Sequence, residues 1–290
     1  MRLCLVNVPY DMGRYNEGHG LGPRKLMSTG LDRMLSEAGI QADSKTILAE
    51  DAEDLTDVQL IFRLNALLSE AVADVLVAQA MPVVLAGNCI TSVGTLSGLH
   101  TDNITVLWLD AHADYNTPET STSGYLDGMA LSVACAKSWQ SLAAKDPRYL
   151  PANEERVALI GAHNIDPKEA ELLKSSRITR ITLDQLRRDD YRLPGDSDPT
   201  PPDLFIHLDA DVLDSSIGHA NEFASPGGLT EADATRVLTR AGTTHRICGL
   251  AVTAFSPAHD GRGTIREALQ RLILHVARTA LETDANPAPR

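Results

Sequence analysis

The chain has 290 residues, of which 43% are hydrophobic and 22% charged, a composition typical of a globular protein that buries a large core. A formal net charge of −13 argues against nucleic acid and against an anionic membrane surface as partners, because both require a basic footprint. No apolar run has the length of a signal peptide or a transmembrane helix, so we expect a cytoplasmic protein. Because α/β folds commonly reach this length as one unit, we expect a single domain over residues 1–290 with a frayed tail at 283–290.

Short apolar runs alternate with helical patterns along the chain. The apolar runs predict strands at 2–8, 83–86, 104–109, 157–161, 178–183, 203–208 and 247–252. Helical spacing predicts helices at 24–38, 58–80, 127–136, 167–173, 231–241 and 265–282, with one more after the turn at 87–89. This alternation predicts an α/β fold whose mostly parallel sheet carries helices on both faces.

The cysteines are spread widely, which favours reduced thiols over a disulfide framework. They are Cys4, Cys89, Cys135 and Cys248. Only Cys89 lies outside apolar surroundings, in the turn that follows a predicted strand. The polar segment 16–20 is either a surface loop or part of the lining of a site.

The segment from Trp108 to Asp114 places three potential metal ligands, Asp110, His112 and Asp114, at the end of an apolar strand. Alternate residues of an extended backbone point the same way, and carboxylates with one imidazole suit a hard or borderline divalent ion. Taken alone, the pattern also fits a capped strand end with solvated acids.

Two other predicted strands also end in candidate ligands. Cys89 follows one strand, and Asp209 and Asp211 follow another. Because ligands of parallel α/β sheets bind outside the carboxyl ends of the strands, we expect all these side chains to meet at one edge. Asp110 and Asp209 are each suited to bridging two ions around a shared hydroxide that is nucleophilic near neutral pH. We therefore predict a hydrolytic site with two metal ions.

The chain resembles the ureohydrolase family, which includes arginase, agmatinase and formimidoylglutamase. The resemblance covers most of the chain and rests on Gly22-Pro23, 110–114, Asn116-Thr117-Pro118, 121–128, 208–211, 227–229 and Gly249-Leu250. It implies a three-layer αβα sandwich, two Mn²⁺ ions, and hydrolysis of a guanidino or amidino carbon–nitrogen bond in a small-molecule substrate. It also implies a homo-oligomer, either a trimer or a hexamer.

The resemblance further implies a role for each residue of the site. The implied metal ligands are Cys89, Asp110, His112, Asp114, Asp209 and Asp211. Asp110 and Asp209 would bridge the ions. His112 and Asp211 would complete the shell of one ion, and Asp114 with Cys89 that of the other.

Other residues match positions that contact the substrate in the family. Asn116 and Ser123 match positions that hold an amino-acid carboxylate in arginase, and Asp166 matches one near the substrate's amino group. These matches imply an amino-acid-like substrate. The catalytic candidates are Asp127 and Asp114.

One departure from the family concerns a metal ligand. Family members usually carry His in a Gly-Gly-Asp-His turn, and here the turn reads Ala86-Gly87-Asn88-Cys89. Because a thiolate is soft, this position would bind Mn²⁺ weakly or admit zinc or iron. Alternatively, Cys89 is a neutral thiol beside a single fully bound metal.

Two more departures concern catalysis and substrate binding. Asp127 stands where arginase has its proton-shuttling His, and it either relays protons with a raised pKa or caps the following helix. Ala254 stands where the family has a guanidinium-binding Glu, whose loss would cost on the order of 2 kcal/mol or more. Glu222 is our candidate replacement.

The Gly-Asn-Cys turn also resembles that of an N-hydroxy-arginine-hydrolysing branch of the family. A hydroxyguanidine is less basic than a guanidine and meets metal through its own oxygen or nitrogen. Our first hypothesis is a hydrolase of arginine metabolism that releases urea or hydroxyurea from arginine or N-hydroxy-arginine and leaves ornithine. The alternatives are a hydrolase of another linear amidine (formiminoglutamate, agmatine or guanidinobutyrate) and a metal-binding pseudoenzyme.

The remaining histidines have simpler interpretations. His163 lies in a loop after a predicted strand and is a candidate for contacting substrate. We interpret His100, His245 and His275 as ordinary surface or packed residues, and His207 as a strand residue ahead of the second Asp pair.

Overall fold

The structure is a computed structural model of the chain, and it describes residues 2–50 and 54–285. In this part of the chain, eight strands form one sheet in the order β4-β1-β5-β10-β9-β6-β7-β8. All neighbouring strands of this sheet run parallel. The predicted parallel α/β fold is confirmed.

The elements follow one another as strand and helix along most of the chain. The strands of the large sheet are β1 (Arg2–Val8), β4 (Ala42–Thr46), β5 (Ala80–Ala86), β6 (Ile104–Leu109), β7 (Val157–Ile160), β8 (Thr179–Ile181), β9 (Asp203–Asp209) and β10 (Arg246–Thr253). A small hairpin consists of β2 (Tyr10–Asp11) and β3 (Arg14–Tyr15).

The helices include several short ones at the ends of strands. The α-helices are α1 (Leu21–Ser28), α2 (Leu31–Glu37), α3 (Asp57–Val77), α4 (Thr91–Leu99), α5 (Ala130–Ala134), α6 (Gln140–Ala143), α7 (Pro167–Ser175), α8 (Leu183–Arg187), α9 (Glu231–Thr244) and α10 (Thr264–Ala285). The 3-10 helices are η1 (Gly18–Gly20), η2 (Asp127–Met129), η3 (Glu154–Arg156) and η4 (Ala210–Val212). None of the helices in the described residues has the length and apolar character needed to cross a membrane.

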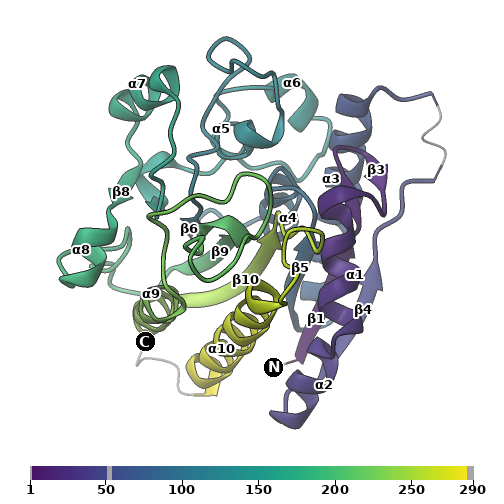
Figure 1. The fold of residues 1–290 in the computed structure, drawn as a ribbon, viewed down its shortest axis with the longest axis vertical. Coiled ribbons are helices and arrows are strands. Elements are labelled where there is room, and N and C mark those ends of the chain that lie inside the picture. Colours follow the sequence, from purple (N-terminus) through teal and green to yellow (C-terminus); the bar gives the residue numbers. More distant parts are fainter. Residues whose placement is uncertain (1, 51–53, 286–290) are drawn as a thin grey trace.

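The sheet separates two hydrophobic cores, because successive residues of a strand point to opposite faces. Leu3 and Leu5 of β1 belong to the core that also contains side chains of α1, α2, α9 and α10. Cys4, Val6 and Val8 of the same strand belong to the core formed with α3, α4 and α5. Helices therefore cover both faces of the sheet, as a three-layer arrangement requires (Figure 1).

The helix predicted at 24–38 is in fact two helices, and it begins earlier. α1 starts at Leu21, and the chain breaks between α1 and α2 at Gly30. Gly30 has a φ of 93°, in the left-handed region that glycine adopts without a steric penalty. The hydrophobic spacing continues across this break, so the periodicity alone does not reveal it.

Two smaller predictions also need correction, and one strand was not predicted. The strand predicted at 178–183 is shorter, because the side chain of Thr182 caps α8 by accepting a hydrogen bond from the backbone N–H of Gln185. The tail predicted to fray from residue 283 is helical through Ala285, while residues 286–290 lie outside the described part. The polar and largely exposed edge strand β4 has no apolar pattern from which it could be predicted.

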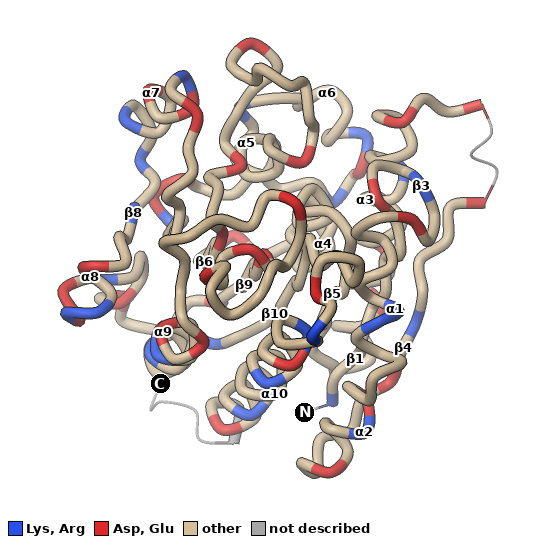
Figure 2. The backbone as a smooth tube through the Cα atoms, in the orientation of Figure 1, with Lys and Arg blue, Asp and Glu red and all other residues tan. Residues whose placement is uncertain are grey.

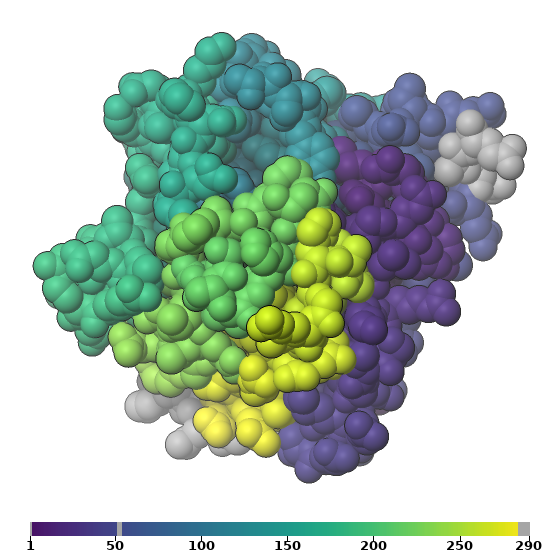
Figure 3. All heavy atoms as spheres, in the orientation of Figure 1, coloured from purple at the N-terminus to yellow at the C-terminus, as the bar shows by residue number. Residues whose placement is uncertain are grey.

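The four central strands β5, β10, β9 and β6 are neighbours in the sheet, and their carboxyl ends lie at one edge. Acidic residues follow β6 and β9 at this edge (Figure 2). In the space-filling view, the first residues, the middle of the chain and its C-terminal part adjoin one another on one face (Figure 3). The fold thus gathers polar loops from distant parts of the sequence.

Candidate metal centre and substrate cavity

The predicted metal-binding residues lie at or just after the ends of three of the four central strands. Cys89 occupies the turn between β5 and α4, Asp110 follows β6 directly, and Asp209 is the last residue of β9. All three side chains are buried. The parallel sheet therefore brings together residues more than a hundred positions apart in the sequence.

His112 connects two of the acids. Its Nδ1 lies 3.4 Å from Asp110 Oδ1 and 3.5 Å from Asp211 Oδ2. Burial alone would lower the pKa of His112, but hydrogen bonding to Asp110 and Asp211 raises it to about 12. On the other side of the ring, Asn164 Nδ2 lies 3.2 Å from His112 Nε2. The imidazole thus presents Nδ1 to two carboxylates, an arrangement suited to one divalent ion.

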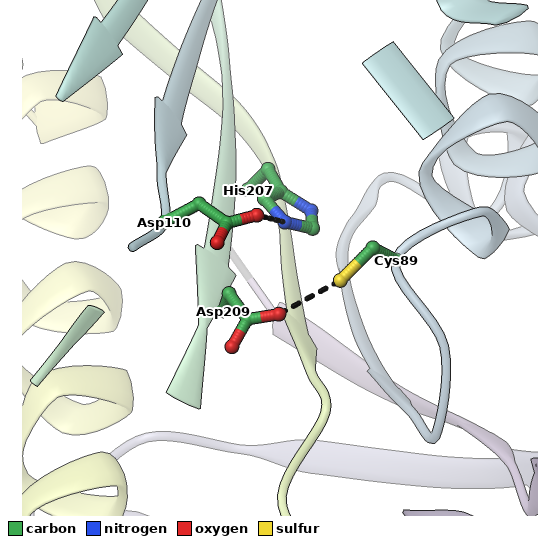
Figure 4. Close-up of side chains that lie close together, drawn as sticks. All are labelled: Cys89, Asp110, His207 and Asp209. Atoms are coloured by element: carbon green, nitrogen blue, oxygen red, sulfur yellow. Dashed lines mark hydrogen bonds and ion pairs between the residues drawn. The ribbon is translucent and has the colours of Figure 1, made fainter. Parts of the chain in front are cut away.

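A second group contains the cysteine. Cys89 Sγ donates a hydrogen bond to Asp209 Oδ2 at 2.8 Å and lies 3.3 Å from Thr253 Oγ1. Burial raises the pKa of the Cys89 thiol, and the charge of Asp209 raises it further. Potential ligand atoms of Cys89, Asp110, His207 and Asp209 all lie within 4.8 Å of one another (Figure 4).

His207 was not among the predicted site residues. It is fully buried on β9, and its ring stacks on Trp108 with the centroids 3.6 Å apart. Its Nδ1 lies 2.8 Å from Ser92 Oγ, and its Nε2 lies 3.9 Å from Asp110 Oδ2. Burial lowers the pKa of His207 to about 3. The sequence carries a signal for this residue, because a position two before Asp209 on a strand shares its face.

The carboxylates of the site are buried close to one another. Asp114 is 5% exposed, and its Oδ2 has no hydrogen-bond partner. Burial raises the pKa of Asp114 and of Asp209, and neighbouring acids raise both further. Buried like charges are costly unless a cation neutralises them. The donor set and the unpartnered oxygen therefore fit divalent metal ions, which would be held by the predicted ligands.

A cavity of about 300 Å³ adjoins these residues. The predicted substrate-binding residues Asn116, Ser123 and Asp166 all line it. Asn116 Nδ2 donates to Asp166 Oδ2 at 3.4 Å, and Ser123 Oγ accepts a hydrogen bond from the backbone N–H of Tyr125 at 3.1 Å. The cavity lining thus includes amide, hydroxyl and carboxylate groups.

Asp127 lines the same cavity but does not cap the helix that follows it. Its Oδ1 accepts a hydrogen bond from the backbone N–H of Ile90 at 2.8 Å, and its Oδ2 accepts one from Asn88 Nδ2 at 2.9 Å. The capping alternative is therefore wrong, because the carboxylate is fixed to the start of α4 instead. Burial raises the pKa of Asp127 to about 6.

Glu222 is held away from the cavity lining, although its neighbours Asn221 and Phe223 contribute to that lining. Glu222 Oε2 lies 2.9 Å from Nε2 of the buried His19. Burial would raise the pKa of Glu222, but the hydrogen bond with His19 lowers it. Ala254 lines the cavity, and so does His19 itself, which places part of the polar segment 16–20 at the site.

Residues 161–164 contribute through a different side chain from the one expected. His163 binds the carbonyl oxygen of Gly161 and the hydroxyl of Ser225, and it does not line the cavity. The next residue, Asn164, both lines the cavity and contacts His112. An amide after a strand is common in ordinary loops, so the sequence offers little to single it out.

Comparison with known proteins decides the family. The model of the arginase family matches residues 1–280. The chain belongs to the arginase family. The arginase of Bacillus subtilis is 29% identical over 194 residues, a region that covers 64% of this chain and 66% of that protein. The aligned region thus spans just under two thirds of that relative.

Solved structures share the fold of this chain. The crystal structure of the Bacillus subtilis arginase aligns with a TM-score of 0.83 at 24% identity and covers 96% of this chain and 98% of that one. The proclavaminate amidino hydrolase of Streptomyces clavuligerus aligns with a TM-score of 0.71 at 17% identity and covers 96% and 91%. These structural matches confirm the predicted three-layer fold, and the family model over residues 1–280 confirms the predicted family.

Proposed function

We propose that the arginase-family chain is a metal-dependent hydrolase that cleaves a guanidino or hydroxyguanidino carbon–nitrogen bond of an arginine-like amino acid. The products are ornithine and urea or hydroxyurea. The observation that carries the proposal is the cluster of buried acids around His112 beside a cavity of about 300 Å³. Metal ions, when bound there, would lower the pKa of a water molecule so that it attacks carbon near neutral pH.

The proposed ions are two Mn²⁺, with the position nearest Cys89 binding manganese weakly or taking another divalent metal. Asp110 and Asp209 would be shared by the two ions, since Asp110 belongs to both groups of candidate ligands and Asp209 accepts a hydrogen bond from the backbone N–H of Asp211. His112 and Asp211 complete one position, while Asp114 and Cys89 contribute to the other. The unpartnered Oδ2 of Asp114 supports its role as a ligand.

The cavity wall supports an amino-acid-like substrate. Asn116 and Ser123 offer amide and hydroxyl groups for an α-carboxylate, and Asp166 offers a negative charge for an α-amine. Asn116 and Asp166 are already in contact with each other, so one substrate end reaches both. With this end bound, the substrate's head group would be free to meet the candidate metal ligands Cys89, His112, Asp114, Asp209 and Asp211, which line the same cavity.

Asp127 is the proposed proton carrier. Its pKa of about 6 allows it to hold a proton and release it near neutral pH, as a general acid or base requires. The hydrogen bonds from Ile90 and Asn88 fix the carboxylate in the cavity wall. In this position it accepts a proton from the attacking water and delivers one to the leaving nitrogen.

Ala254 in the cavity lining, and the Glu222–His19 pair beside it, support a hydroxyguanidine in preference to a guanidine. Ala254 offers no charge to a guanidinium, and the Glu222 carboxylate already pairs with His19 at 2.9 Å. A strongly basic head group would therefore lack a free carboxylate at this position. A hydroxyguanidine is less basic and depends less on such a partner, which supports N-hydroxy-arginine as the substrate.

A substrate panel tests the proposal. The protein, loaded with manganese or zinc, is incubated with arginine, N-hydroxy-arginine, agmatine, guanidinobutyrate and formiminoglutamate, while ornithine, urea and ammonia are assayed. Ornithine from arginine or N-hydroxy-arginine supports the proposal. If only another compound of the panel is hydrolysed, the substrate is a different linear amidine. If no compound is hydrolysed with any metal, the result favours a metal-binding pseudoenzyme.

We also propose, from family membership, a homo-oligomer in the form of a trimer or hexamer and a role in arginine metabolism. Light scattering on the purified protein measures the mass directly. A mass equal to the 31.2 kDa chain would contradict the oligomer.

A further inference from the structure

His207 and Cys89 each lie beside a carboxylate, the His207 ring next to Asp110 and the Cys89 sulfur next to Asp209 (Figure 4). The four side chains come from β9, from the turn after β5 and from the end of β6. His207 is completely buried and none of the others is more than 3% exposed. One sulfur, one ring nitrogen and two carboxylate oxygens therefore share a small buried volume next to the cavity, which Cys89 and Asp209 help to line.

The orientation of the His207 ring is fixed from its far side. Nδ1 lies 2.8 Å from the hydroxyl oxygen of Ser92, which is itself buried. When Nδ1–H donates to this hydroxyl, Nε2 carries the lone pair, the form in which imidazole binds metals. Stacking on Trp108 holds the plane of the ring. The side chain is thus held with Nε2 directed at the acids.

Nε2 of His207 has no hydrogen-bond partner. Its nearest carboxylate oxygen, Asp110 Oδ2, is 3.9 Å away, beyond hydrogen-bond range. That oxygen already accepts a hydrogen bond from Trp108 Nε1 at 3.2 Å. A buried polar atom without a partner needs an explanation, and a cation between the ring and the acids supplies one.

The donor atoms point to a particular kind of ion. Four ligands of sulfur, nitrogen and oxygen type match the tetrahedral sets in which proteins hold zinc. Manganese prefers oxygen and imidazole, so a thiolate disfavours it. The separations of the ligand atoms, all within 4.8 Å, leave room for an ion after small rotations of the side chains.

We propose that, when a zinc-like ion occupies the Cys89 position, His207 Nε2 takes the place of Asp114 as a ligand, together with Cys89 Sγ, Asp110 and Asp209. Cys89 binds as a thiolate, and its proton leaves to solvent when the ion enters. Asp110 and Asp209 are shared with the second position, which is completed by His112 and Asp211. The inference rests on the proposed metal centre, but it requires neither a particular substrate nor turnover.

X-ray absorption at the zinc edge tests the ligand set directly. One equivalent of zinc is added to the metal-free full-length protein and to the His112→Ala and His207→Ala variants. The wild-type spectrum should show one sulfur at about 2.3 Å and nitrogen or oxygen at about 2.0–2.1 Å. Scattering from one imidazole should persist in His112→Ala and disappear in His207→Ala.

Affinity provides a second readout with a matched control. Loss of a residue that only orients a ligand lowers metal affinity about 10–100-fold. If His207 is itself a ligand, the zinc affinity of His207→Ala should fall by more than about 100-fold. His245→Ala is the control, because His245 is also buried but binds the carbonyl oxygen of Pro194 at the opposite end of β10. This control should keep the zinc affinity of the wild type.

Several outcomes would overturn the inference. A spectrum without sulfur would do so, as would imidazole scattering that vanishes in His112→Ala. If His207→Ala does not fold, the comparison of wild type with His112→Ala still shows whether the imidazole bound to zinc comes from His112. If the protein hydrolyses its substrate but the spectrum lacks these ligands, the inference is wrong and the proposed function stands. If the spectrum shows these ligands but no substrate is hydrolysed, the inference stands and the proposed function is wrong.

Discussion

The thiol of Cys89 donates a hydrogen bond to Asp209 Oδ2 over 2.8 Å, from the turn after β5 to the end of β9. This contact joins the residue that departs from the family pattern to a proposed bridging ligand. The sulfur is therefore close enough to share an ion with Asp209. Because a thiolate is a soft ligand, the residue at position 89 determines which metal ion this position prefers.

Replacing Cys89 with His should raise manganese occupancy, because imidazole suits manganese better than a thiolate does. Elemental analysis after desalting measures the occupancy of wild type and variant. Cys89→Ser is the control for loss of the sulfur alone, and it should not gain manganese. Equal or lower manganese content in Cys89→His would contradict this assignment.

Asp114→Asn should separate metal binding from stability. Burial raises the pKa of Asp114 in the folded state above its ordinary value of 3.8. At a pH above 3.8, the Asp114 carboxyl group therefore loses its proton more readily in the unfolded chain than in the folded one. In metal-free protein the native Asp114 therefore lowers stability as the pH rises from about 4 toward its folded pKa. Asn does not ionise, and it tolerates the φ of 50° at this position.

Denaturant unfolding with a chelator at pH 5 and pH 8 measures this effect. Asp114→Asn should be more stable than wild type at pH 8, by on the order of 1 kcal/mol for each unit of raised pKa, with a smaller gain at pH 5. The variant should also bind metal less tightly. A variant less stable than wild type at pH 8 without metal would show that the carboxylate is not strained by burial.

Asp127→Asn tests the proton carrier. With a pKa of about 6, Asp127 should give a rate that rises with pH between about 5 and 7 as the base form accumulates. The Asn variant should lose about 10²–10⁴-fold in kcat together with this rising limb. Asp166→Asn is a useful comparison, since loss of a substrate contact should raise KM and leave the limb in place. An unchanged pH profile in Asp127→Asn would exclude the relay.

Glu222→Ala tests the candidate replacement for the missing Glu. If Glu222 leaves His19 to meet the head group, its removal should raise KM for arginine about 30-fold, equivalent to about 2 kcal/mol. The effect on N-hydroxy-arginine should be smaller, because its head group is less basic. Glu222→Gln keeps an acceptor for His19 and serves as the control. Normal binding of arginine by Glu222→Ala would end this role for Glu222.

The sequence predicted the fold well where hydrophobic spacing is regular. The buried strands β5, β6 and β9 are largely apolar runs in the sequence. The acidic residues of the candidate metal centre lie at the ends of β6 and β9 or in the turns after them. The break at Gly30 and the polar edge strand β4 were not predicted. A left-handed glycine and a solvent-exposed edge strand leave the hydrophobic spacing unchanged, so this signal does not detect them.

At the site, the sequence predicted which residues converge but not how the neighbouring side chains connect them. Asp110 and Asp209 meet because parallel strands end at one edge. The contact of Glu222 with His19 joins positions 203 residues apart and depends on two loop conformations. We interpreted His207 as an ordinary strand residue because a single histidine within a strand is usually packed. Its position two before Asp209 hinted at the site, and its unpartnered Nε2 in the structure distinguishes it from a packed histidine.

The most direct test of the central claim is ornithine release from N-hydroxy-arginine and from arginine, measured with the metal-loaded protein and again after chelation. We expect ornithine from N-hydroxy-arginine with a higher kcat/KM than from arginine, and loss of both activities after chelation and in Asp209→Asn. Absence of ornithine from both substrates, with manganese, zinc or iron supplied, would contradict the account.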